Sequence, residues 1–229
     1  MTFAVRCILA VALVALAGCG DSGSSTTAEP DIPIVATLGD SITAGFPGWS
    51  PNPDLRAVIA EHGELTRSSQ WQYWAAAATD GAFRFRNCGV EGDRTDEIAA
   101  RFAHCTAGAD VVVLQGGTND LVQGGTVASA AANLRDMVRR AQAAGLRALV
   151  TTVPPINRRY PTWAAEVRRL NARIRSFARD AGVRVIDFFG VLEDPRRPDR
   201  MPARRTDDGV HPTVDGYARL GRAAARQLE

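Results

Sequence analysis

The sequence predicts a single α/β domain, a three-layer αβα sandwich around a five-stranded parallel sheet with strand order 2-1-3-4-5. Short apolar runs rich in β-branched residues alternate along the chain with longer segments of helical periodicity. Strands and helices that alternate in this way form parallel sheets joined by right-handed crossovers. The chain has 229 residues and no visible internal repeat, which suits one generous domain rather than two.

The first strand is expected at residues 32–38, where an apolar run ends in Gly-Asp-Ser. Later strands are expected at residues 83–87, 111–115, 146–153 and 183–188, and helices at residues 70–78, 93–103, 127–144, 163–181 and 213–228. The strand order is flavodoxin-like, and ligands of such sheets bind outside the carboxyl ends of the strands. Active-site residues should therefore follow strands directly.

The amino-terminal residues resemble the export signal of a bacterial lipoprotein. The apolar run at residues 7–17 is too short to cross a bilayer. It overlaps Leu16-Ala17-Gly18-Cys19, which resembles a lipobox in which the Cys19 thiol takes the lipid. The alternative is an ordinary secretory signal in which Cys19 is incidental.

A polar, Ser- and Thr-rich stretch follows and has nothing to bury, which is typical of a flexible tether. We therefore expect a signal peptide at residues 1–18, an anchor Cys and tether at 19–30, and a catalytic domain at 31–229. This organisation predicts an extracytoplasmic protein, lipid-anchored to the cell membrane, that meets the membrane only through its anchor.

The composition, 45% hydrophobic and 23% charged, is that of a globular protein, and a net charge of +2 gives no reason to expect nucleic acid as a partner. Every basic residue is Arg, so a phosphate-loop lysine, a Schiff base and a Ser-Lys dyad are excluded. The histidines are scattered, and we expect neither a metal site nor an organic cofactor. A monomer is expected.

Ser41 is the candidate nucleophile because it follows the first strand, where a rigid scaffold can hold a hydroxyl group at the edge of the sheet. The triplet Gly39-Asp40-Ser41 says little by itself, since Gly20-Asp21-Ser22 repeats it inside the tether. The alternative role for Ser41 is a helix N-cap.

A serine hydroxyl needs a base within hydrogen-bond reach, and the base needs a third group to orient it. His62, in a charged segment expected to be a loop, and His104, at a helix end, are expected to be solvated. His211 follows Asp208 by three residues across a glycine, so the carboxylate can fold back onto Nδ1 and leave Nε2 to face Ser41. Alternatively, this pair forms only a turn and a helix cap.

Acyl transfer also needs donors aimed at a developing oxyanion. Two glycine-containing loops follow strands, at residues 87–93 and 116–120. Glycine allows close approach of a backbone N–H group, and the Asn119 amide is a directed donor. Both Gly89 and Gly92 qualify on these grounds. The alternative is that both loops are ordinary tight turns.

Together these blocks resemble the SGNH, or GDSL, hydrolase family in order and spacing, over residues 33–228. The resemblance implies that Ser41 is the nucleophile, His211 the base and later acid, and Asp208 the orienting carboxylate. It implies an oxyanion hole made by the N–H groups of Ser41 and Gly92 and the amide of Asn119. The choice of Gly92 over Gly89 rests on the family pattern.

The expected activity is hydrolysis of a carboxylic ester, on a small molecule or a polysaccharide, through an acyl-Ser41 intermediate. Transfer of the acyl group to a sugar hydroxyl and an inactive, glycan-binding lipoprotein remain alternatives. The long segment at residues 42–69 departs from the family pattern. Its prolines and charged residues predict a polar wall rather than a lipase lid, and hence a preference for short acyl chains.

Two further features are left open by the sequence. Cys88 and Cys105 could form a disulfide if their Cα atoms lie within ~7 Å, although Cys88 is expected near the carboxyl end of the second strand and Cys105 follows a helix that should run towards the opposite end. An arginine-rich stretch at residues 196–205 is either a solvated basic loop or a cationic lip beside the site that draws an anionic substrate.

Overall fold

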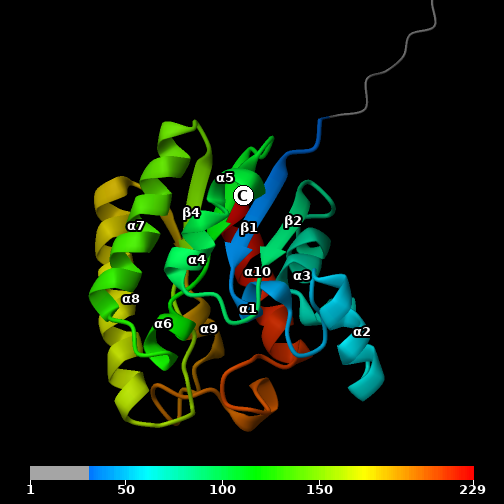
Figure 1. Ribbon diagram of the computed structural model, residues 1–229, viewed down its shortest axis with the longest axis vertical. Helices are drawn as coiled ribbons and strands as arrows, with labels where there is room; N and C mark the ends of the chain where they lie inside the picture. The colour runs from blue at the N-terminus through cyan, green and yellow to red at the C-terminus, as the bar shows by residue number, and fades with distance from the viewer. Residues whose placement is uncertain (1–30) are drawn as a thin grey trace, which may run out of the picture. The chain divides into compact units, whose positions relative to one another are not determined.

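The computed structural model describes residues 31–229, which form a parallel sheet with helices packed on both faces (Figure 1). The sheet has five strands in the order β2-β1-β3-β4-β5, and every neighbouring pair is parallel. The strands are β1 Ile34–Gly39, β2 Arg84–Gly89, β3 Val111–Leu114, β4 Arg147–Thr151 and β5 Arg184–Ile186. The predicted fold class is therefore confirmed.

Successive residues of the central strands point to opposite faces of the sheet and enter two separate cores, because the side-chain period of a strand is two residues. Ala36 and Leu38 belong to one core, whereas Val35 belongs to the other. The first core is closed by α4 Thr95–Ala100, α5 Phe102–Thr106, α7 Val127–Ala143 and α8 Thr162–Ala181. The second is closed by α3 Trp71–Ala78, α9 Phe188–Leu192 and α10 Val214–Leu228.

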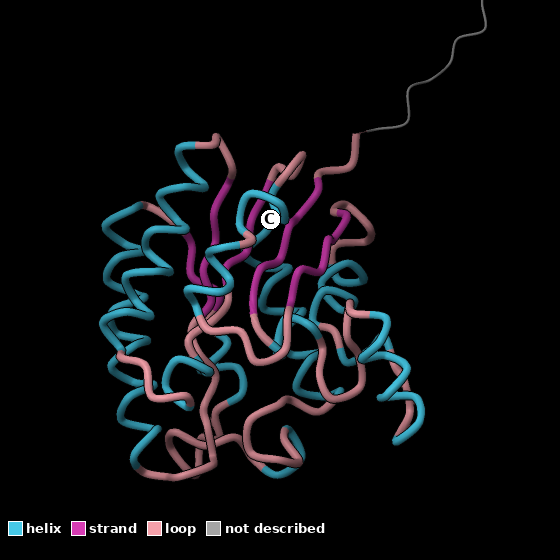
Figure 2. Tube along the Cα trace, in the orientation of Figure 1, coloured by secondary structure: helices cyan, strands magenta, loops and turns pink. Residues whose placement is uncertain are grey.

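The remaining helices are short and lie in the connections: α1 Ser41–Ala44, α2 Pro53–His62 and α6 Thr118–Val122. Single 3-10 turns occur at Arg67–Ser69 and Ala203–Arg205. Figure 2 shows these loops and short helices gathered below the carboxyl ends of the strands, while β1 begins at the opposite edge. The fold thus places a candidate site at the carboxyl ends of the strands, among these loops and short helices.

Two sequence-based expectations about helices are wrong. The helix expected at residues 93–103 is broken at Arg101, whose backbone is not helical and whose guanidinium group donates to the carbonyls of Gly39 and Cys88. The segment expected to be irregular contains α2, which begins at Pro53 with an Asn52 N-cap. His62 therefore ends a helix instead of lying in a loop, although it is exposed as expected.

No helix in the described part of the chain is long and apolar enough to cross a membrane. The predicted signal peptide, Cys19 and the predicted tether, at residues 1–30, lie outside the described residues.

Candidate active site

Ser41 is the first residue of α1, directly after β1, and only 8% of it is exposed. The N-cap is Asp40, whose carboxylate accepts from the Ile42 N–H at 2.9 Å, so Ser41 does not serve as the cap and its hydroxyl is free. A Cβ atom on Gly39 would lie 2.2 Å from the Thr43 hydroxyl and 2.4 Å from the Gln115 side chain. Only glycine fits this tight strand-to-helix turn.

The three residues expected to form a triad are joined by hydrogen bonds. The Oγ atom of Ser41 lies 2.9 Å from Nε2 of His211, and Nδ1 of His211 lies 2.6 Å from Oδ2 of Asp208. The other carboxylate oxygen of Asp208 accepts from the N–H groups of Val210 and His211 at 2.9 and 2.8 Å. The cap of α10 is Thr213 rather than His211, so the imidazole is free to face Ser41.

The environment keeps Asp208 charged. Burial raises the pKa of its carboxyl, but hydrogen bonds from the backbone and the ring of His211 more than offset this, and the net pKa is lowered. An ionised Asp208 fixes the proton of the ring on Nδ1. Nε2 can then accept the proton of the Ser41 hydroxyl group.

Two aromatic residues that sequence reasoning missed hold the imidazole. The Phe46 ring meets the His211 ring edge to face, with ring centroids 4.8 Å apart. The hydroxyl of Tyr217, a fully buried residue of α10, donates to the Phe46 carbonyl at 2.6 Å. Phe46 lies in the segment after Ser41 and Tyr217 in the last helix, so only the fold shows that they meet.

The loops expected to supply oxyanion donors come together at the same edge. The amide of Asn119 donates to the carbonyl of Asp93 at 3.0 Å, which orients the side chain and leaves its second N–H free. Gly92 has φ +85° and nothing within 4 Å of a Cβ atom built on it. The N–H of Gly89, in contrast, already donates to Asn87, and a Cβ there would lie 2.0 Å from the Ala44 nitrogen. Gly89 is thus a packing glycine, and Gly92 is the one with an open surrounding.

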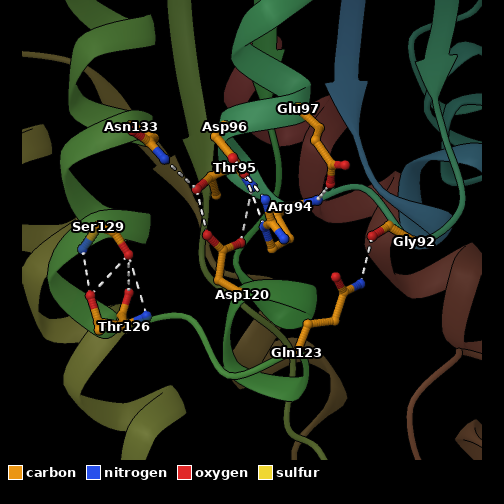
Figure 3. Close-up of polar contacts among 10 residues, drawn as sticks. All are labelled: Gly92, Arg94, Thr95, Asp96, Glu97, Asp120, Gln123, Thr126, Ser129 and Asn133. Carbon is orange, nitrogen blue, oxygen red and sulfur yellow. Dashed lines mark hydrogen bonds and ion pairs between the residues drawn. The ribbon is translucent and has the colours of Figure 1, made fainter.

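The loop after β2 is braced against the residues that follow β3 (Figure 3). Both carboxylate oxygens of Asp120 accept from Thr95, at 3.0 Å from its N–H and 2.6 Å from its hydroxyl, and Asn133 donates to the same hydroxyl. Gln123 donates to the Gly92 carbonyl at 2.8 Å. These contacts fix the position of Gly92 relative to Asn119.

Arg101 braces the site from the side of β1 and β2. Its Nε donates to the Asp93 carboxylate at 2.8 Å, and its terminal nitrogens donate to the carbonyls of Gly39 and Cys88. The guanidinium group therefore links the ends of both strands to the residue after Gly92. The sequence signal that could have revealed it is weak, because Arg101 lies in the middle of a helical pattern.

Asp40 is a buried carboxyl beside the nucleophile. Burial raises its pKa from 3.8 to about 6, against the opposing effect of hydrogen bonds from Ile42 and Gln115. The charge of His211 also lowers this pKa, which places the two groups within electrostatic reach.

The possible disulfide is not formed, since Cys88 and Cys105 are both free thiols. The expectation of opposite ends was nevertheless wrong, because one nitrogen of Arg101 contacts both the Cys88 carbonyl and the Cys105 sulfur. The interaction between the two thiols raises the pKa of Cys88 and lowers that of Cys105 to about 6. Among the described residues, no group of three or more His, Cys, Asp or Glu is arranged to hold a metal ion.

Two cavities flank the Asp208–His211 loop and share Asp207 and Asp208. The larger, about 610 Å³, is lined on the His211 side by Phe46, Pro47, Pro212 and Val214. The smaller, about 420 Å³, is lined by arginines. A leaving group that accepts a proton from His211 must lie on the imidazole side, which is the side of the larger cavity.

A protein family and several solved structures resemble this chain. Residues 37–219 match the GDSL-like lipase/acylhydrolase family. No curated protein sequence matches the chain.

Solved structures with the same fold include a G-D-S-L family protein from Desulfitobacterium hafniense, 18% identical with a TM-score of 0.70, covering 86% of this chain and 100% of that chain. A member of the lipolytic protein G-D-S-L family from Veillonella parvula is 21% identical with a TM-score of 0.66, covering 85% and 96%. A catalytic mutant of an acetylxylan esterase from Geobacillus stearothermophilus is 17% identical with a TM-score of 0.65, covering 86% and 94%.

The family match begins within β1, the strand that leads to Ser41, and includes the two braced loops and the Asp208–His211 loop. The chain therefore belongs to the GDSL-like lipase/acylhydrolase family and is a carboxylic ester hydrolase.

Proposed function

We propose that the protein cleaves esters of short acyl groups in two steps, through an acyl enzyme on Ser41. The observation that carries the proposal is the continuous hydrogen-bonded chain from Ser41 through His211 to Asp208, with distances of 2.9 and 2.6 Å. A serine needs such a base, and the base needs such an orienting group.

In the first step, Nε2 of His211 takes the hydroxyl proton while Oγ of Ser41 adds to the ester carbonyl. The negative charge that develops on the carbonyl oxygen is stabilised by the N–H groups of Ser41 and Gly92 and the free N–H of Asn119. Asp208 stabilises the imidazolium that forms. His211 then returns its proton to the leaving alcohol, and water repeats the sequence on the acyl enzyme.

The preference for short acyl chains is supported by the segment between Ser41 and α3. Its helix α2 has no buried residue, and the segment carries three prolines, Pro47, Pro51 and Pro53. An interfacial lipase needs a lid that covers a sizeable apolar surface in water. A fold neighbour that is an acetylxylan esterase supports a small acyl group as well.

The test is kcat/KM across p-nitrophenyl esters from acetate to palmitate, each measured below and above its solubility limit. We expect a maximum at short chains and no jump in rate when the substrate aggregates. A maximum at long chains, or such a jump, would make the segment a lid and overturn the preference.

We also propose that Cys19 carries a lipid and anchors the protein outside the cytoplasm. The Leu16-Ala17-Gly18-Cys19 string supports this, and the chain enters the domain at the amino end of β1, opposite the catalytic edge. Cys19→Ser should release the protein from the membrane fraction or block its processing. Wild-type protein found entirely free in the medium would contradict the anchor.

A further inference from the structure

The smaller cavity beside Asp208 is built from two segments that are far apart in the sequence. Arg158 comes from the connection after β4, and Arg197 and Arg200 come from the connection after α9. Asn157 joins the two connections: its amide donates to the Met201 carbonyl, and its oxygen accepts from the Met201 N–H, both at 2.8 Å. The cavity walls are therefore fixed by two half-buried hydrogen bonds.

The same wall is attached to the loop from Asp208 to His211, which carries the catalytic base. The N–H of Asn157 donates to the carbonyl of Gly209 at 2.8 Å, and a Cβ atom on Gly209 would lie 3.3 Å from Cγ of Arg158. Gly209 stands between Asp208 and His211. A group bound in this cavity consequently lies next to the catalytic loop.

The guanidinium groups in the cavity have no ion pair with any described carboxylate. The neighbouring carboxylates are already engaged: Asp199 pairs with Arg168, Glu193 accepts from the Asp199 N–H, and Asp208 accepts from His211. The lining thus carries two carboxylates, Asp207 and Asp208, against three arginines. The cavity therefore carries a local excess of positive charge.

One of these arginines is held in place without using its N–H groups. The guanidinium of Arg200 lies 3.8 Å from the centre of the Tyr160 ring. A cation stacked on an aromatic ring keeps the N–H edges of its plane available. Such a planar fork matches a carboxylate with two parallel hydrogen bonds.

We propose that this cavity is a substrate-binding subsite for the carboxylate of an acidic polysaccharide whose acyl ester is presented to Ser41. The inference rests on the proposed esterase function and deepens it. A polysaccharide suits the lining better than a membrane lipid because the cavity is walled by Arg, Asn, Asp and Thr side chains, with a buried Met201, and offers no broad apolar surface for acyl chains.

The test compares two substrates that carry the same acetyl group. Acetylated polygalacturonate has a carboxylate on its sugars, and acetylated glucomannan is neutral. The double variant R197Q/R200Q should lose about tenfold or more of kcat/KM on the acidic polymer, the effect of one lost charge-assisted contact. Its activity on glucomannan and p-nitrophenyl acetate should not change.

Arg158→Gln should act in the same direction, and it tests the cavity from the other connection. The matched control is Arg222→Gln, which replaces an exposed arginine of α10 outside the Asp208–His211 loop, and it should behave as wild type. The preference for the acidic polymer should also fall as salt is added, because exposed charges are screened within roughly 8 Å at physiological ionic strength. An equal loss on both polymers, or no loss on either, would overturn the subsite.

Binding separates this inference from the proposed function. Unacetylated polygalacturonate should bind the Ser41→Ala protein in calorimetry. It should not bind the triple variant that combines Ser41→Ala with R197Q/R200Q. That result supports the subsite even if neither polymer is hydrolysed. If polygalacturonate does not bind, or if phosphatidylglycerol vesicles bind in its place, the subsite is contradicted.

Discussion

The two halves of the catalytic edge are held in different ways. Ser41, Gly92 and Asn119 follow strands β1, β2 and β3, and side-chain hydrogen bonds tie their loops together. Asp208 and His211 lie on a connection that follows α9 and no strand. There the imidazole depends on Asp208 itself and on the edge of Phe46. The sheet positions the first half, whereas the second is positioned by the hydrogen bonds of Asp208 and by contacts with other connections, from Phe46 and Asn157.

If this contrast is correct, kcat should be more sensitive to a single polar substitution in the half that carries Asp208 and His211. Asp208→Asn should lower kcat by about 10⁴-fold, because an amide cannot hold the proton of the ring on Nδ1 in the same way. The measurement is kcat on p-nitrophenyl acetate, with exposed Asp180→Asn on α8 as the control. A loss of tenfold or less would mean that the loop orients His211 without its carboxylate.

In the strand-end half, removal of one oxyanion donor should cost less. Asn119→Ala should lower kcat by roughly 10²–10³ with little change in KM, since the amide acts on the developing charge. Stopped-flow measurement of the acylation step would isolate this effect. If KM alone rises, Asn119 binds the ground state and is not an oxyanion donor.

The strand-end half also buries a carboxyl group, and this should lower stability. The folded-state pKa of Asp40 is about 6 against an ordinary 3.8, so the folded protein binds more protons than the unfolded chain between these values. The free energy of unfolding should therefore fall, through this group, as the pH rises from 3.8 to about 6.

Asp40→Asn removes the titration and keeps an oxygen for the Ile42 N–H. The free energy of unfolding of the variant minus that of wild type should be up to about 3 kcal/mol larger at pH 7 than at pH 4. The reason is that each pKa unit is worth ~1.36 kcal/mol. Urea unfolding at both pH values measures this difference. If the variant and wild type differ by the same amount at both pH values, the ionisation of Asp40 does not lower the stability of the protein.

The smallest expected effect comes from removing the hydrogen bond that positions the Gly92 loop. Gln123→Ala should lower kcat by about tenfold, a barrier change of about 1.4 kcal/mol, because the Gly92 loop loses one positioning hydrogen bond. Gln142→Ala is the matched control: its amide donates to a backbone carbonyl, that of Ala181 at the end of α8, at the same 2.8 Å, and its loss should leave kcat unchanged. Equal effects of the two variants would assign Gln123 a role in stability alone.

The contrast also explains how far the sequence could predict the molecule. Alternating strand and helix patterns predicted the sheet order, and the rule for strand ends then predicted the neighbourhood of Ser41 and Asn119. The spacing of Asp208 and His211 predicted their contact because it depends on one local turn. Arg101, Phe46 and Tyr217 could not be predicted, since their contacts join segments up to 171 residues apart. The α2 helix was missed because its sequence has no face that the fold buries.

The most direct test of the central claim is covalent labelling with a fluorophosphonate, followed by mass spectrometry of the peptides. Wild type should be labelled on Ser41, and the variant Ser22→Ala, which changes the other Gly-Asp-Ser triplet, should be labelled to the same extent. Ser41→Ala should not be labelled, and His211→Ala should react far more slowly because the hydroxyl loses its base. Label on another residue, or undiminished labelling of Ser41→Ala, would contradict the assignment of Ser41 as the nucleophile.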